Sequence, residues 1–216
     1  MSFRLSILFS VSMAILTPVL ASTEDTFVSI LERIKFKESQ HFQYQETRYL
    51  ALLTRPWTAN GDMFITPDGL VMVQHEPTSI LTTITEKKLE YFDRERDVRR
   101  TIRLKQPFSV PGMAPFLQLL YRSKQQGSLD EQYNTSFNLK QERWILALRP
   151  SQTNKNKIKS MTLSGSQGKG PDLLKLEYTD GDETEWRLSL IAHGHDAIHR
   201  LQKTLDKINE ENDFDN

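Results

Sequence analysis

The sequence predicts a mainly β protein, of the α+β kind, built on one strongly curved antiparallel sheet. About eleven short segments have strand character, turn residues rather than helices connect most of them, and only three short segments have helical spacing. Such a sheet is too large to stay flat, and three short helices are too few to cover both of its faces. We therefore expect the sheet to wrap around helices and to leave an apolar hollow. An ordinary two-sided core is the alternative, and periodicity alone favours neither.

The first 21 residues have the anatomy of a secretory signal peptide. Arg4 precedes an apolar stretch over 5–16, and Ala21 ends a plausible cleavage site. The stretch is shorter than the about 20 apolar residues that span a bilayer. We expect cleavage after Ala21, export of the chain, and a single folded domain over 22–216. A buried N-terminal core helix is the alternative.

The composition excludes several classes of function. The chain has 28 basic and 28 acidic residues and no cysteine. Because nucleic-acid-binding domains usually carry a strong basic excess, we expect no nucleic-acid partner. The lack of cysteine excludes thiol catalysis and disulfides, so an exported domain of this sequence depends on its hydrophobic core.

A helix is expected before the first strand, because Phe27, Ile30, Leu31 and Ile34 recur at helical spacing. From residue 40 onward the period changes to two. Strands are then expected over 41–53, 57–66, 70–75, 79–85, 88–92 and 97–104. Since the connections are short, the strands form an antiparallel meander.

A proline-rich loop over 107–115 precedes a second short helix, which is expected to end near Gly127. Strands resume over 133–139, 143–148, 157–163, 173–179 and 184–192. The spacing of Ile198, Leu201, Leu205 and Ile208 predicts a C-terminal helix, followed by a frayed acidic tail over 210–216.

The hairpin over 61–77 is apolar on both of its faces. Residues 63–65 and 70–73 are consecutive apolar runs on either side of a Pro67-Asp68-Gly69 turn. Successive side chains of a strand point to opposite faces, so a sheet with one wet face would alternate here. We expect one face to meet a helix or packed core and the other to line the hollow.

The succession of these segments resembles the periplasmic carriers of outer-membrane lipoproteins, the LolA family. The segments that carry the resemblance are the aromatic strand 42–48, the hairpin 61–70, the segments 75–81 and 88–93, the helix at 115–120, and the strands over 144–150, 157–163 and 173–187. They cover nearly all of residues 22–216 as loose patterns. The pattern is more similar to the divergent LolA-like branch than to the best-studied members.

The resemblance implies an unclosed antiparallel β-barrel whose helices form a lid over an apolar cavity. It implies a non-enzymatic, cofactor-free monomer in the periplasm of a Gram-negative bacterium, in transient contact with membranes. The cargo would be an acylated lipoprotein or another envelope lipid, received from an inner-membrane donor complex and passed to an outer-membrane acceptor. Best-studied members carry a latch arginine before the hairpin proline, where this chain has Thr66.

The expected cavity lining follows from the apolar strand residues. The candidates are Phe64, Leu70, Met72, Ile80 and Leu89, with Tyr91 and Phe92 nearby. Flexible methionine side chains suit irregular acyl packing, although methionine is also a common core residue.

A charged pair interrupts the apolar row of the first strand. Alternation places Glu46 and Arg48 on the face that also carries Phe42 and Tyr44. Since an unpaired buried charge is costly, the two should pair with each other or with lid carbonyls, unless a bulge returns them to solvent. We hypothesise that Arg48 replaces the absent latch and holds the lid shut, so that Arg48→Leu alters cargo release more than folding.

Two other functions remain open at this point. A lipid-sensing or assembly module would use the same hollow and bind a protein partner without transport. A metal-dependent lipid hydrolase would use His193, His195 and His199, of which the last two could lie one turn apart on the C-terminal helix. A solvated turn with Asp196 as the helix cap is the alternative for this segment.

Overall fold

The computed structural model describes residues 38–85, 87–104, 133–151 and 158–213. The predicted signal peptide, the first helix and the helix expected at 116–127 lie outside these residues. The helical lid, and the hollow beneath it, therefore stay predictions.

Eleven antiparallel strands form one sheet, and each predicted strand is present. The first six are β1 (Gln40–Tyr49), β2 (Trp57–Thr66), β3 (Gly69–Glu76), β4 (Ile80–Thr85), β5 (Lys88–Asp93) and β6 (Val98–Arg103). The other five are β7 (Tyr133–Lys140), β8 (Arg143–Pro150), β9 (Ile158–Ser166), β10 (Pro171–Tyr178) and β11 (Glu183–His193). Helix α4 (Gly194–Asp213) follows β11 directly.

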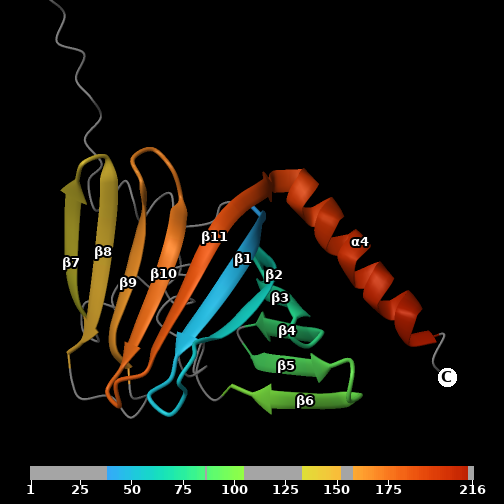
Figure 1. Ribbon diagram of the computed structural model, residues 1–216. Coiled ribbons are helices and arrows are strands. Elements are labelled where there is room, and N and C mark those ends of the chain that lie inside the picture. Colours follow the sequence, from blue (N-terminus) through green and yellow to red (C-terminus); the bar gives the residue numbers. More distant parts are fainter. Residues whose placement is uncertain (1–37, 86, 105–132, 152–157, 214–216) are drawn as a thin grey trace, which may run out of the picture.

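The order of the strands is β6-β5-β4-β3-β2-β1-β11-β10-β9-β8-β7. Two meanders, β1–β6 and β7–β11, meet where β1 pairs with β11 along its full length. The sheet twists strongly, so that β4–β6 run across the direction of β7–β10 (Figure 1). Strands β6 and β7 lie at the two ends of this order and do not pair with each other. This confirms the prediction of an unclosed sheet.

The end of β1 differs from the sequence prediction. The strand stops at Tyr49 instead of Leu53, and Leu52 is 97% exposed. Two hydrogen bonds turn the chain here: the Leu53 amide donates to the Leu50 carbonyl, and the Ala51 amide donates to Asp182 in the β10–β11 turn. These bonds direct the chain back toward β2, which alternation cannot reveal.

Helix α4 runs beside the β2–β3 hairpin (Figure 1), and apolar side chains of the two pack together. The residues in this contact are Phe64, Val71, Val73 and Leu81 from the strands and Leu201, Leu205 and Ile208 from the helix. The helix begins at Gly194 and runs to Asp213, so part of the expected acidic tail is helical. Asp196 lies inside the first turn and forms an ion pair with Arg200, rather than capping the helix.

Candidate functional site

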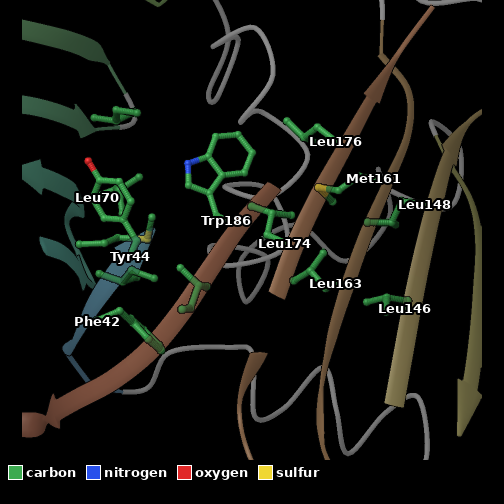
Figure 2. Close-up of a cluster of buried hydrophobic side chains, with 14 of the residues drawn as sticks. Phe42, Tyr44, Leu70, Leu146, Leu148, Met161, Leu163, Leu174, Leu176 and Trp186 are labelled. Atoms are coloured by element: carbon green, nitrogen blue, oxygen red, sulfur yellow. The ribbon is translucent and has the colours of Figure 1, made fainter. Parts of the chain in front are cut away.

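One face of the sheet carries a continuous apolar surface, which we call the inner face. Every strand except β5 and β6 contributes a buried residue to it. The buried members are Phe42, Tyr44, Met63, Ile65, Leu70, Ile84, Tyr133, Trp144, Leu146, Leu148, Met161, Leu163, Leu174, Leu176, Trp186 and Leu188. Figure 2 shows that side chains from the two halves of the sheet face a common region. These buried side chains are at most 6% exposed, and partly buried apolar residues pack against them.

Five of the seven predicted lining residues share the inner face. Leu70 and Met72 lie opposite Ile84 and Thr82 on β4, and the same row continues to Leu89 and Tyr91 on β5. Ile80 lies in that row by alternation along β4. Leu70 is fully buried, whereas Met72, Ile80, Leu89 and Tyr91 are only partly buried. The β3–β5 end of the inner face therefore keeps accessible apolar surface.

Phe64 and Phe92 lie on the opposite face, which we call the outer face. Phe64 packs under α4 and stacks on the His41 ring, with ring centroids 4.2 Å apart. Phe92 lies under the Arg99 guanidinium at 4.1 Å. Phe64 and Phe92 therefore would not line a hollow on the inner face, contrary to the sequence expectation. Alternation along β5 already separates Phe92 from Leu89 and Tyr91. The hairpin is apolar on both faces, so its pattern could not assign Phe64 to one of them.

Glu46 and Arg48 form a charged pair on the inner-face side of β1. Glu46 is 3% exposed, and its Oε1 accepts a hydrogen bond of 2.6 Å from Arg48 Nε. The Arg48 side chain is 45% exposed and stacks over the Trp57 ring at 4.4 Å. The expected pairing of the two charges is thus present. The irregularity in β1 falls at His41/Phe42, so no bulge turns Glu46 toward solvent.

Sequence reasoning missed Trp186, which lies directly opposite Glu46 on the neighbouring strand β11. The side chain is 5% exposed, and its Nε1–H has no hydrogen-bond partner in the described part of the chain. Leaving a buried donor unpaired costs about 1–3 kcal/mol. The alternation of Thr184, Trp186 and Leu188 along β11 could have placed this indole on the inner face, but not its unpaired state.

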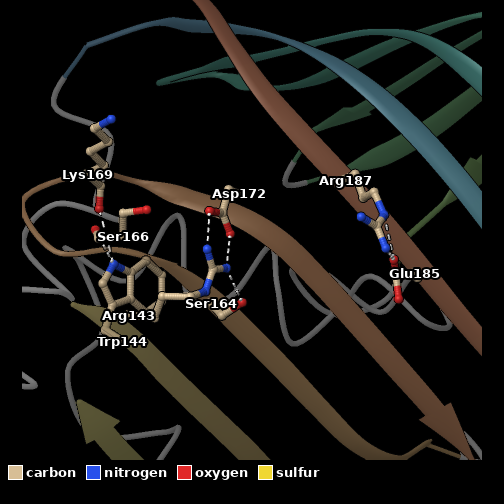
Figure 3. Close-up of polar contacts among 8 residues, drawn as sticks. All are labelled: Arg143, Trp144, Ser164, Ser166, Lys169, Asp172, Glu185 and Arg187. Atoms are coloured by element: carbon tan, nitrogen blue, oxygen red, sulfur yellow. Dashed lines mark hydrogen bonds and ion pairs between the residues drawn. The ribbon is translucent and has the colours of Figure 1, made fainter. Parts of the chain in front are cut away.

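The other inner-face indole, Trp144, is fully satisfied. Its Nε1–H donates to the carbonyls of Ser166 and Lys169 at 3.1 and 3.2 Å, as Figure 3 shows. Gly165 lies beneath the ring, where a Cβ atom would approach Trp144 Cζ2 to 2.6 Å. The glycine therefore makes room for the indole on β8.

The outer side of β8–β11 is polar, in contrast to the inner face. Arg143 makes two hydrogen bonds with Asp172, at 2.7 and 3.0 Å, and a third with Ser164 (Figure 3). These bonds with Asp172 raise the pKa of Arg143 above its usual value. Arg187 pairs with Glu185 on the same side. This half of the sheet thus has one solvated face and one apolar face.

Thr66, at the position of the family's latch arginine, has a local role in the β2–β3 turn. Its Oγ1 accepts hydrogen bonds from the amides of Asp68 and Gly69 and donates to the Gly69 carbonyl. The side chain therefore stabilises the hairpin turn.

The C-terminal histidines do not form a metal site in the described residues. No group of three or more histidine, aspartate or glutamate side chains there could hold a metal ion. His195 and His199 lie one turn apart on α4, and His193 contacts Glu38 at 3.8 Å. The hydrolase alternative therefore gains no support from this segment.

The buried Tyr44 should make the stability of the protein fall at alkaline pH. Burial, reinforced by the charge of Glu46, raises the pKa of Tyr44. In the unfolded chain tyrosine ionises near pH 10, so above about pH 10 the unfolded state binds fewer protons than the folded state and stability falls as the pH rises. We expect Tyr44→Phe to reduce this fall by up to about 1.4 kcal/mol per pH unit. Urea unfolding between pH 8 and pH 12 measures it. Equal slopes for wild type and Tyr44→Phe would contradict the assignment.

The fold and the inner face define a class: an open, twisted antiparallel sheet with one largely apolar face, one of its hairpins backed by a C-terminal helix. No helix among the described residues is long and apolar enough to cross a membrane. No family model and no curated protein matches the sequence.

Solved structures similar to the chain include three with sequence identities of 9–11%. A DUF1329 family protein from Desulfovibrio piger has a TM-score of 0.41 and aligns over 74% of this chain and 87% of its own. A LolA superfamily protein from Nitrosomonas europaea has a TM-score of 0.37, with 75% and 90% covered. A domain from Vibrio parahaemolyticus named as an outer membrane lipoprotein-sorting protein also has 0.37, with 74% and 88% covered.

Proposed function

We propose that the protein is a periplasmic carrier that shields the acyl chains of a lipoprotein or another envelope lipid and moves this cargo from the inner toward the outer membrane. The continuous apolar inner face carries the proposal. Each CH₂ group exposed to water costs about 0.8 kcal/mol, so one chain of about sixteen carbons opposes free diffusion by roughly 10 kcal/mol. A carrier offsets this cost by apolar contact and needs no catalytic group.

The partly buried residues Met72, Ile80, Leu89 and Tyr91 form the part of the face that we assign to cargo contact. They adjoin the fully buried Leu70, so acyl chains laid on them extend the existing core. Flexible Met72 adapts to chains of different lengths.

Transfer of lipid between vesicles tests the proposal. The full chain, stripped of lipid by unfolding and refolded, should extract a labelled diacyl lipid from donor vesicles and deliver it to acceptor vesicles. Excess unlabelled lipid should compete. Extraction no faster than in the absence of protein would overturn the carrier role.

We assign the Glu46–Arg48 pair to the control of release. Arg48→Leu leaves the buried Glu46 carboxylate without its partner, so this variant should lose about 1–3 kcal/mol of stability, less than a fully buried pair because Arg48 is half exposed. The double variant Glu46→Gln/Arg48→Leu removes the stranded charge and should recover part of that loss.

Release is therefore measured in the double variant. We expect it to release labelled lipid to acceptor vesicles at a changed rate while it remains folded, with an unfolding midpoint above that of Arg48→Leu. A wild-type release rate in this folded variant would exclude the pair from release.

A further inference from the structure

We propose that the cargo is held by an ester or amide carbonyl at the junction of its acyl chains and head group, and that Trp186 Nε1–H donates a hydrogen bond to that carbonyl. This inference rests on the proposed carrier function and deepens it by naming the chemical group that the inner face recognises.

The unpaired donor of Trp186 is the first observation. An indole N–H can donate but not accept, so only an acceptor satisfies it. Its 5% exposure removes it from bulk water, and no described residue accepts from it. Glu46, the acid directly opposite on β1, accepts from Arg48 instead.

The position of Trp186 along the strands is the second observation. On β1 the inner face changes from Phe42 and Tyr44 to Glu46 and Arg48. On β11 it changes in the same direction, from Leu188 through Trp186 to Thr184. On these two strands Trp186 therefore lies where apolar side chains give way to polar ones, while Leu174 and Leu176 on β10 keep the other side of Trp186 and Thr184 apolar.

An acylated molecule has the same order of groups. Its hydrocarbon tails end at ester or amide carbonyls, and the polar head begins beyond them. If the tails run past Phe42 toward Met72, which lies in the same cross-strand row, the carbonyls reach the level of Trp186 and the head reaches Arg48, whose side chain is half exposed at that end. The donor, the apolar stretch and the cation thus match one orientation of the guest.

A pair of neutral lipids tests the inference: dipalmitoylglycerol, which has ester carbonyls, and dihexadecylglycerol, in which ether links replace them. One net hydrogen bond corresponds to a roughly threefold to tenfold change in affinity. Wild type should bind the ester lipid more tightly by that factor. Trp186→Phe keeps an aromatic ring but removes the donor, so it should bind both lipids equally, with affinity for the ether lipid unchanged.

Trp144→Phe is the matched control, because the Trp144 donor is already satisfied by two backbone carbonyls. This variant should keep the ester preference, since the preference is a ratio within one protein and is independent of its stability. The indole proton resonance of Trp186 in wild type provides a second measurement. It should shift downfield with the ester lipid and not with the ether lipid.

The possible results distinguish a failure of the carbonyl contact from a failure of the carrier function. Equal wild-type affinities for the two lipids, or a preference that survives in Trp186→Phe, would overturn the carbonyl contact and leave the carrier function standing. An indole resonance that shifts equally with both lipids would overturn it as well. Binding of neither lipid would overturn the carrier function itself, and this inference with it.

Discussion

Truncation of Trp144 to alanine is expected to lower the free energy of unfolding by about 3–5 kcal/mol. The indole is fully buried, and its Nε1–H donates to two backbone carbonyls in the β9–β10 turn. The substitution therefore opens a large cavity and leaves the carbonyls of Ser166 and Lys169 without this donor. Urea unfolding, followed by circular dichroism, measures the loss.

Gly165→Ala tests the packing of the Trp144 ring against β9. The added Cβ would lie 2.4 Å from the Gly170 carbonyl oxygen and 2.6 Å from the Trp144 ring. Because the first of these is a backbone atom, the clash cannot be relieved by a rotamer change, and we expect a loss of about 1–3 kcal/mol or more. Gly170→Ala, whose Cβ meets no atom within 4 Å, is the control and should stay within about 0.5 kcal/mol of wild type. A Gly165→Ala variant as stable as the control would contradict this packing.

A charge on the inner face is expected to weaken acyl binding by tenfold or more, which corresponds to about 1.4 kcal/mol. Thr82 is the best position, since it lies between Met72 and Tyr91 on the inner face and is only partly buried. Thr82→Asp places a carboxylate against the bound hydrocarbon, and burying that charge is costly. Titration with a fluorescent diacyl lipid measures the affinity.

The neighbouring Thr83 gives a matched control, because successive residues of a strand point to opposite faces. Thr83 is also partly buried and lies opposite Val71 and Glu90. Thr83→Asp adds repulsion from Glu90, so it should destabilise the fold at least as much as Thr82→Asp does. It should nevertheless leave lipid affinity unchanged. Equal losses of affinity in the two variants would exclude the inner face as the binding surface.

Alternation and turn chemistry were sufficient to predict all eleven strands and the antiparallel character of the sheet, but not the pairing of β1 with β11 that joins the two meanders. They also placed Glu46 and Arg48 on one face, where pairing with each other was one of the expected arrangements, because a period of two fixes which side chains share a face. The end of β1 was wrong because a contact distant in sequence, between Ala51 and Asp182, turns the chain.

The assignment of the hairpin's two faces, and with it the place of Phe64, could not be predicted. The β2–β3 hairpin is apolar on both sides, so its pattern contains no information about which face meets α4. Only the position of the helix assigns Phe64 to the outer face. The unpaired N–H of Trp186 could not be predicted either, because a sequence indicates the face on which an indole lies but not the hydrogen-bond partners of its nitrogen.

Native mass spectrometry of the protein purified from its native host tests the central claim most directly. The account predicts a complex in which each protein molecule retains one acylated molecule, released on denaturation and containing ester- or amide-linked chains. A preparation that is folded and free of any acylated molecule, and that takes up none when mixed with lipid vesicles, would contradict it.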